Sequence, residues 1–237
     1  EGVYRSAQEQ DPNESFYLNF AEDQMGEDLP FAPLLDEVRP LLEHQGQPVY
    51  LVGGAVRDVL LGRVSHDLDF VVPRDAVSLT FRLADAIGAP AYVLDEQRDT
   101  GRIVLSSEKT MLDFARYRGS DLFADLRDRD FTINALAMPA TARTREAVLA
   151  PVSGLADLES GLLRLVHADA LKRDPVRALR AVRLAADLGY RITPDTQAAV
   201  REVAPSLEEI SAERVRDELL KIVQAPTADR AVEQMHS

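Results

Sequence analysis

The stretch from Leu51 to Val72, LVGGAVRDVLLGRVSHDLDFVV, constrains the fold of this chain more than any other part of it. A short apolar run ends at the glycine pair Gly53 and Gly54, which lets the backbone turn tightly and approach a ligand closely. We expect a helix to follow at once, with its free N–H groups facing an anion and Arg57 as a planar donor suited to phosphate. The order of strand, glycine turn and helix therefore predicts a phosphate-binding element.

Two aspartates follow this predicted helix, one residue apart. Asp67 and Asp69 lie in the apolar segment 67–72, a predicted strand whose two-residue period puts both carboxylates on one face. Adjacent carboxylates repel each other, and a hard cation such as Mg2+, held by carboxylates and substrate phosphates, relieves that repulsion. Asp67 and Asp69 are thus the predicted metal ligands and catalytic groups. A glycine pair alone is typical of a plain turn, and D-x-D alone is typical of a solvated strand edge. The prediction of a nucleotide site therefore depends on the order in which the two occur.

This order, G-G-x-V-R-D and then D-x-D, resembles the catalytic signature of the polymerase-beta-like nucleotidyltransferases, specifically the class II tRNA nucleotidyltransferases and bacterial poly(A) polymerases. A second segment, DLRDRDFTINALA at residues 125–137, is similar to that family's motif R-R-D-F-T-x-N-A, with Asp128 in place of the first arginine. In the family this segment contacts the sugar of the incoming nucleotide, so the resemblance implies that role for Arg129, Asp130 and Asn134. The alternative is that Asp130 caps a helix that begins one or two residues later.

A third carboxylate is expected between these two motifs. Residues 102–105 and 110–115 are predicted strands, and Asp113 lies in the second of them. Family members carry an acidic residue in the matching strand. The resemblance therefore implies that Asp113 completes a two-metal centre, in which one ion activates the primer 3'-hydroxyl and the other holds the triphosphate.

A further signature, KRDPVRALRAVRLAADLGYR at residues 172–191, carries an argument about base recognition. Asp174 is the expected N-cap of a helix with Pro175 at its first position, and Arg177 lies three residues on, on the same face. An aspartate accepts hydrogen bonds and an arginine only donates them, so the pair matches an exocyclic amine beside an unprotonated ring nitrogen. Adenine and cytosine present that pattern, whereas guanine and uracil present the reverse.

The resemblance implies the same role, because the family's D-x-x-R element acts as a protein template for incoming CTP and ATP. Arg180, one turn beyond Arg177, is assigned to the nucleotide with it. The residue before the aspartate is usually acidic in the family and is Arg173 here. The alternative for Asp174 and Arg177 is an ordinary capped helix with an intrahelical ion pair.

The segment SAERVRDELLKIV at residues 211–223 resembles the family's last motif, whose role is to brace the template helix. We expect Ser211 to be its N-cap and an apolar face to be formed by Leu219, Leu220 and Val223. The segment is interpreted as structural.

Composition narrows the class of protein. The chain of 237 residues has no cysteine, which excludes disulfides and thiolate metal sites and fits a reducing cytoplasm. No apolar stretch is long enough to span a membrane and no signal sequence is evident, so we expect a soluble cytoplasmic protein. The net charge of −13 argues against binding RNA, but residues 164–191 hold seven basic side chains against three acidic ones. Arginine is therefore concentrated beside the predicted nucleotide site.

The predicted fold class is α+β, with a polymerase-beta-like nucleotidyltransferase head followed by an all-α neck. Residues 1–30 are acidic with little periodicity and form an N-terminal extension. Strands alternate with helices in the head, residues 31–153, and helical periodicity dominates the neck, residues 154–237, which would recognise the base and bind RNA.

The predicted function is template-independent addition of CMP, AMP or both, from CTP and ATP, to the 3' end of an RNA, most readily tRNA, with Mg2+ as cofactor. Such an enzyme adds CCA, CC or A. The first alternative is a poly(A) polymerase, which shares all these motifs. The second is a non-catalytic nucleotide-binding or RNA-binding module, against which the intact carboxylates argue.

Three matters stay open at this point. Full family members carry helical body and tail domains that bind RNA, and nothing in this sequence corresponds to them. Three explanations are left open: the chain is an excised fragment, it is a shortened natural form, or a partner supplies the RNA-binding surface. The short segment between Asp113 and Arg129 resembles enzymes that add only CC or only A. The oligomeric state is not predicted.

Overall fold

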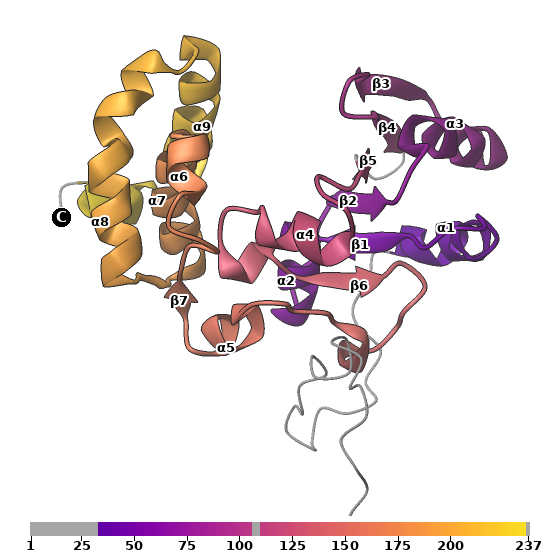
Figure 1. Cartoon of the computed structure of the whole chain (residues 1–237), viewed down its shortest axis with the longest axis horizontal. Coiled ribbons are helices and arrows are strands. Elements are labelled where there is room, and N and C mark those ends of the chain that lie inside the picture. The colour runs from indigo at the N-terminus through magenta and orange to yellow at the C-terminus, as the bar shows by residue number, and fades with distance from the viewer. Residues whose placement is uncertain (1–32, 106–109, 236–237) are drawn as a thin grey trace, which may run out of the picture.

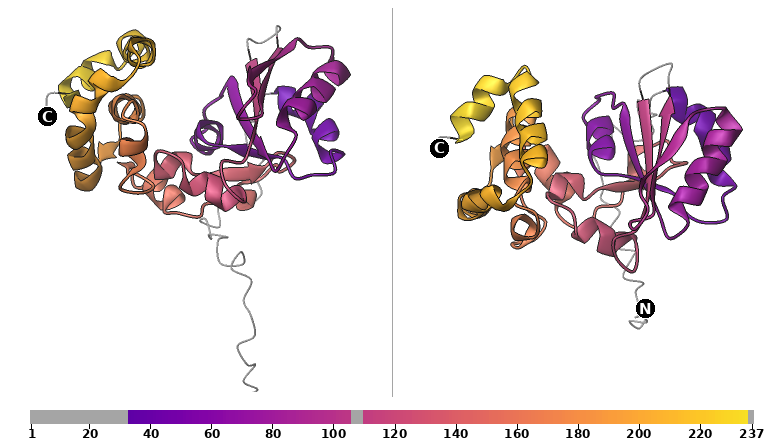
Figure 2. Two further views of the ribbon diagram at one scale, coloured as in Figure 1. Left: turned by 45° about the horizontal axis from the view of Figure 1, so that its top comes forward. Right: turned by 90° about the horizontal axis from the view of Figure 1, so that it is seen from above.

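The computed structural model describes residues 33–105 and 110–235. The predicted acidic extension, residues 1–30, lies outside them. The described chain has two lobes: a head built on a β-sheet and a neck built of helices, with the segments around residues 120–165 between them in every view (Figures 1 and 2). Among the described residues, no helix combines the length and the apolar composition needed to cross a membrane.

A mixed six-stranded sheet forms the head, with the strand order β3-β4-β5-β2-β1-β6. Strands β2 and β5 are parallel, and every other neighbouring pair is antiparallel. The strands are β1 (Tyr50–Val52), β2 (Asp67–Val72), β3 (Ala91–Asp95), β4 (Thr100–Leu105), β5 (Thr110–Arg116) and β6 (Ala137–Pro139). The parallel register sets Asp69 directly beside Asp113, although 44 residues separate them in the sequence.

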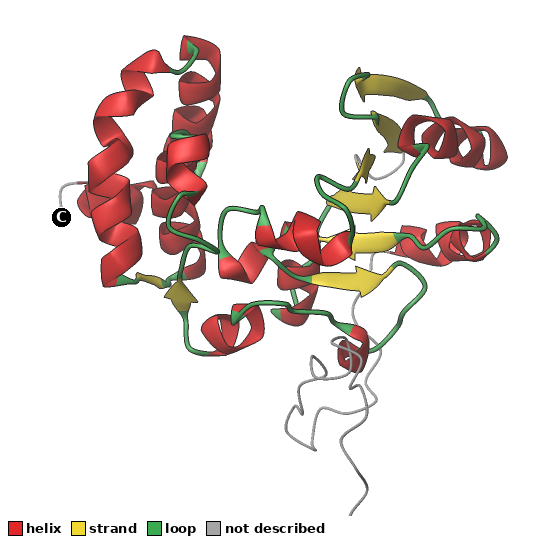
Figure 3. Cartoon of the chain, in the orientation of Figure 1, coloured by secondary structure: helices red, strands yellow, loops and turns green. Residues whose placement is uncertain are grey.

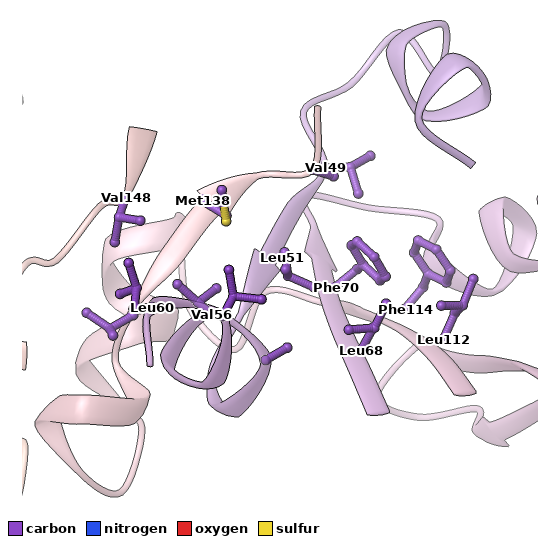
Figure 4. Close-up of a cluster of buried hydrophobic side chains, with 14 of the residues drawn as sticks. Val49, Leu51, Val56, Leu60, Leu68, Phe70, Leu112, Phe114, Met138 and Val148 are labelled. Carbon is purple, nitrogen blue, oxygen red and sulfur yellow. The ribbon is translucent and has the colours of Figure 1, made fainter. Parts of the chain in front are cut away.

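Alternating side chains give this sheet one apolar and one polar face near its centre. In β5, Leu112 and Phe114 are buried and Asp113 between them is only partly so; in β2, Leu68 and Phe70 are buried and flank exposed Asp69. The rings of Phe70 and Phe114 stack with centroids 4.8 Å apart in the core (Figure 4). Burial of the aromatic pair thus orients both carboxylates toward the opposite face.

Helices accompany the sheet in the head, and helices make up most of the neck (Figure 3). The head helices are α1 (Pro33–Glu43), α2 (Gly54–Leu60), α3 (Ala76–Ile87) and α4 (Leu122–Arg127), with 3-10 turns η3 (Thr132–Asn134) and η4 (Arg145–Ala147). Helix α3 packs against β3, β4 and β5. The later elements are α5 (Gly154–Glu159), β7 (Leu162–Leu163), α6 (Ala170–Arg173), α7 (Arg177–Leu188), β8 (Arg191–Ile192), α8 (Pro194–Val203), η5 (Ala204–Glu209), α9 (Ala212–Gln224) and α10 (Ala228–Met235).

The predicted α+β class is confirmed, with one correction to the neck. We expected an all-α neck, but β7 and β8 pair as a small parallel sheet. The glycines at 161 and 189 adopt left-handed backbone conformations just before these strands, and Arg191 donates its N–H to the carbonyl oxygen of Gly161. Two-residue strands leave no periodicity for a sequence pattern to detect.

The main buried apolar cluster continues past the predicted head boundary at residue 153. It includes Leu155 and Leu158 of α5 together with Ala181 and Leu184 of α7, alongside the head core. Gly154 makes this continuity possible, because a Cβ built there would overlap the Thr132 carbonyl oxygen. The start of α5 therefore lies directly against η3.

We predict that Gly154→Ala destabilises the protein by about 1–3 kcal/mol, because the added methyl group must displace a backbone carbonyl and the Leu136 side chain, 2.9 Å away. Denaturant unfolding followed by circular dichroism measures this. Ser153→Ala is the matched control, since Ser153 is exposed and its side chain makes no capping hydrogen bond. An unchanged stability in Gly154→Ala would contradict the close packing of α5 on η3.

Candidate functional site

A cleft of about 1300 Å³ lies between the head and the neck. Its floor comes from the β1–α2 turn and from β2 and β5. One wall is made by the segment that follows β5 through residue 134, and the other by α6, α7 and α9. Most of the predicted site residues line it, namely Gly53, Gly54, Asp69, Asp113, Arg129, Asp130, Asn134, Asp174, Arg177 and Arg180. Two do not: Arg57 is buried beneath the cleft, and Asp67 lies at the exposed start of β2.

The glycine turn is built as the sequence predicts. Gly53 has φ 75°, a left-handed conformation that favours glycine, and α2 begins at Gly54. A Cβ at Gly53 would lie 2.8 Å from Nη1 of Arg129 and 4.0 Å from Oδ2 of Asp69. Because Gly53 has no side chain, the Arg129 guanidinium and the Asp69 carboxylate can both lie close to the backbone of the turn.

Arg57 has a different set of contacts from the one expected. Its Nη1 donates to Oδ1 of Asn134 at 2.6 Å, and its Nε and Nη2 both donate to Oδ1 of Asp58, at 2.9 and 2.8 Å. The guanidinium thus holds Asn134 in place from beneath the cleft. Direct contact of Arg57 with phosphate stays a prediction.

Asp130 and Asn134 form the centre of a buried polar network. Oδ1 of Asp130 accepts hydrogen bonds from the Phe131 N–H at 2.8 Å and from Nδ2 of Asn134 at 3.0 Å, and its Oδ2 lies 3.0 Å from Nε of Arg180. Burial alone would raise the pKa of Asp130, but the charge of Arg180 and these two hydrogen bonds outweigh it and hold the pKa below its usual value. Asp130 does not cap a helix: the 3-10 turn η3 has Phe131 at its N-cap and no capping side chain, and the ion pair of Asp130 reaches across to the neck.

The three predicted catalytic carboxylates differ in their surroundings. Asp69 faces the open cleft with protein on its other sides; desolvation, joined by the charges of Asp113 and Asp67, raises its pKa, although Arg129 and Arg180 oppose the shift. Asp113 is engaged by Arg102, whose Nε and Nη2 each donate to one of its oxygens at 2.6 Å. Across the described ranges, no three His, Cys, Asp or Glu side chains gather closely enough to hold a metal ion.

Two of these residues fit a hard cation. Asp67 and Asp69 lie on the same face of β2, and oxygen ligands of this kind suit Mg2+. The raised pKa of Asp69 indicates a carboxylate that a positive charge would stabilise. Because Arg102 already neutralises Asp113, Asp67 and Asp69 are the pair that would hold Mg2+.

Asp174 does not cap α7, which corrects the sequence-based expectation. The helix begins at Arg177, with Val176 at the N-cap and no capping side chain. Oδ2 of Asp174 instead accepts from Nη2 of Arg214 at 2.8 Å and lies 3.9 Å from Nε of Arg177. Its Oδ1 is buried and finds no hydrogen-bond partner among the residues described. An acceptor is therefore left available beside Arg177 in the cleft.

Helix α9 packs against α7, and a buried carboxylate lies in the contact. Glu218 and Ile222 are buried against α7, and Glu218 accepts from Nε of Arg183 at 3.0 Å. The leucines 219 and 220 and Val223 are exposed by 38%, 46% and 66%. The predicted apolar face is thus largely exposed, and Arg183 and Lys221 compensate the charge of Glu218 and allow a carboxylate on the inner face.

Sequence reasoning missed two residues that shape the cleft. Asp125, almost fully buried, accepts from Nε and Nη2 of Arg129 at 3.2 and 2.9 Å and so aims that guanidinium. The i, i+4 spacing of Asp125 and Arg129 was the available signal. Arg118 also lines the cleft, where burial and then the charges of Arg129 and Arg177 lower the pKa of its guanidinium. Nothing in the loop sequence RYRGS marks that residue.

Comparison with protein families gives two matches that cover different parts of the chain. Residues 49–127 and 119–164 match the family described as the poly A polymerase head domain. Residues 189–237 match the one described as the probable RNA and SrmB-binding site of polymerase A. Together the matches take in both lobes of the structure.

Named relatives and a solved structure agree with these matches. The chain is 41% identical over 197 residues to a CC-adding tRNA nucleotidyltransferase of Geobacter sulfurreducens, covering 83% of this chain and 45% of that protein. It is 39% identical over 187 residues to an A-adding tRNA nucleotidyltransferase of Deinococcus radiodurans, covering 77% and 41%. It also resembles the crystal structure of a tRNA nucleotidyltransferase complexed with a primer tRNA and an incoming ATP analog, with a TM-score of 0.75, 30% identity and coverage of 84% and 59%. The chain spans less than half the length of the two relatives.

The low pKa of Asp130 predicts an acid-sensitive contribution to stability. That contribution is complete above the usual carboxyl pKa of 3.8 and is lost as the pH falls through the lower, folded-state value. Asp130→Asn should lower the free energy of unfolding at pH 7 by about 1–3 kcal/mol and flatten its fall below pH ~4. Chemical denaturation at several pH values measures both. Asp85→Asn, an exposed substitution on α3, is the control, and an acid-side slope in Asp130→Asn as steep as in the wild type would contradict the assignment.

Proposed function

The chain belongs to the family of tRNA nucleotidyltransferases and poly(A) polymerases, and on that premise we propose that it transfers CMP or AMP from CTP or ATP to the 3' end of tRNA. The observation that carries the proposal is the convergence of two kinds of group in one cleft. Asp69 and the glycine turn come from the head, and Asp174 and Arg177 come from the neck. A nucleotide needs both, because its triphosphate and its base are recognised by different chemistry.

In the proposed reaction, the primer 3'-oxygen forms a bond to the α-phosphorus while the bond from that phosphorus to the β-phosphate oxygen breaks, and pyrophosphate leaves. Mg2+ held by Asp67 and Asp69 would neutralise charge on the triphosphate. The backbone of Gly53 and the guanidinium of Arg129 lie beside Asp69 and would bind phosphate oxygens. Arg118 adds a further positive charge to the same wall.

Base selection is assigned to Asp174 and Arg177. The unpartnered Oδ1 of Asp174 would accept from the exocyclic amine of adenine or cytosine, and the Arg177 guanidinium would donate to the ring nitrogen. Guanine or uracil would set a carbonyl oxygen against Oδ1 and leave both groups unpaired in a buried position. Arg214 supports the proposal by fixing the other oxygen of Asp174.

The number and kind of nucleotides added are inferred from the relatives and from one short segment of the chain. The two relatives described above add CC and A, respectively, and both are named for action on tRNA, so a poly(A) polymerase activity has less support. The short segment between Asp113 and Arg129 supports an enzyme that adds only CC or only A. A cytoplasmic location, expected from the sequence, stays a prediction.

We predict incorporation of labelled CTP or ATP, with Mg2+, into tRNA transcripts that end before CCA, after C or after CC. Addition of C to the two shorter ends, of A after CC, or of both in order would identify a CC-adding, A-adding or CCA-adding enzyme. Asp69→Ala should reduce incorporation by about a thousandfold, since it removes one of the two carboxylates that would hold Mg2+ against the triphosphate. Asp85→Asn should leave incorporation unchanged. A growing ladder of A would instead identify a poly(A) polymerase, and full activity of Asp69→Ala would refute the assigned centre.

We predict that Arg177→Ala lowers the preference for CTP and ATP over GTP and UTP by about ten- to a hundredfold, since one base-edge donor is lost. The affinity for the triphosphate should change less, because Arg129 and the glycine turn remain. Competition between nucleotides for incorporation measures the preference. The control is Arg191→Ala, which removes an exposed neck arginine outside the cleft lining. Unchanged base preference in Arg177→Ala would defeat the template assignment.

A further inference from the structure

Two ion pairs join the head to the neck across the cleft. The inner one is the buried pair of Asp130 and Arg180, which belongs to the site already described. The outer one joins Asp128 to Arg173, with Oδ1 and Nη1 2.5 Å apart. Asp128 directly follows α4 in the head and Arg173 is the last residue of α6 in the neck. The outer pair therefore bridges the cleft between residues that are 45 positions apart in the sequence.

Each member of the outer pair is the chain neighbour of a residue assigned to the nucleotide. Asp128 precedes Arg129, which lies against the glycine turn, and Arg173 precedes Asp174, whose Oδ1 has no partner among the described residues. A change in the separation of the backbone at Asp128 from that at Arg173 would therefore move the phosphate side and the base side of the cleft relative to each other.

The same two positions are where the sequence departs from the family pattern. An arginine is usual at the position of Asp128, and an acidic residue is usual at the position of Arg173. Here the two positions carry opposite charges that attract each other. Like charges at these two positions would repel each other across the cleft.

We propose that Asp128 and Arg173 form a clasp that fixes the separation of head and neck and thereby positions Asp174 and Arg177 opposite the phosphate-binding residues. The consequence for nucleotide selection rests on the proposed function, whereas the mechanical role does not. The side chains are exposed by 37% and 59%, so the pair contributes little to global stability. Its effect is on the geometry of the cleft.

A distance measurement tests the clasp without relying on activity. The chain has no cysteine, so Asp85→Cys on α3 and Ala198→Cys on α8 give one exposed spin-label site in each lobe. Asp128→Arg and Arg173→Asp should each broaden the distribution of label distances measured by pulsed electron spin resonance. The double variant Asp128→Arg with Arg173→Asp should restore the narrow distribution. About 1 M salt should broaden the wild-type distribution too, since an exposed pair is screened.

A neighbouring ion pair provides the matched control. Lys172, next to Arg173, pairs with Glu202 at 2.8 Å, and both residues belong to the neck. Lys172→Glu changes the local charge by the same amount as Arg173→Asp without touching the head. It should leave the distance distribution narrow. Circular dichroism of every variant, and the milder Asp128→Asn and Arg173→Gln, exclude unfolding as the cause of any broadening.

Equilibrium binding of CTP and ATP separates the two proposals. If the wild type binds them, the single reversals should weaken binding and reduce selectivity against GTP and UTP by roughly fivefold, and the double reversal should recover both. If the wild type binds neither, the proposed function fails, while the label distances still decide the clasp. Unchanged distances in both single reversals, or a double reversal as broad as the singles, would overturn the clasp.

Discussion

The buried polar network that runs from Arg57 through Asn134 and Asp130 to Arg180 is the constraint on which the site depends. It begins in α2, directly behind the glycine turn, and ends in α7, which also carries Arg177. Loss of any inner member would leave a buried donor or acceptor unpaired. The network thus fixes the position of the glycine turn relative to α7. It also explains why the D-F-T-x-N segment has an aspartate and an asparagine at its two ends.

Charge in this protein is organised around the cleft and not over the whole surface. The net charge is −13, yet basic and acidic side chains line the cleft in equal number. Arg102 neutralises Asp113, Asp125 orients Arg129, and Arg214 holds Asp174, so these three groups of the site are each oriented by an opposite charge. Such preorganisation favours an anionic ligand, because little reorientation is needed when it binds.

Short-range patterns predicted the parts of the site that depend on local geometry. The strand at residues 67–72 and the helix after Gly53 were predicted from alternation and from the glycine pair, and both are observed. Patterns misassigned the residues whose partners lie far along the chain. The carboxylate of Asp174 looked like a cap until Arg214, 40 residues on, was in place, and the apolar pattern of α9 did not indicate that Glu218 is buried. The periodicity of a helix shows which of its faces is apolar, but a charged side chain that forms an ion pair can lie on the buried face instead.

By itself, the sequence determined the order of the site's elements and the chemical type of its groups. Glycine tolerance of positive φ, the strand period and the donor or acceptor character of each side chain are properties of residues and their immediate neighbours. The tertiary structure alone decided the pairings: Asp113 with Arg102, Asn134 with Arg57, and Asp128 with Arg173. Those pairings depend on strand register and on how two lobes meet, which are set by the packing of the whole core and leave no trace in local spacing.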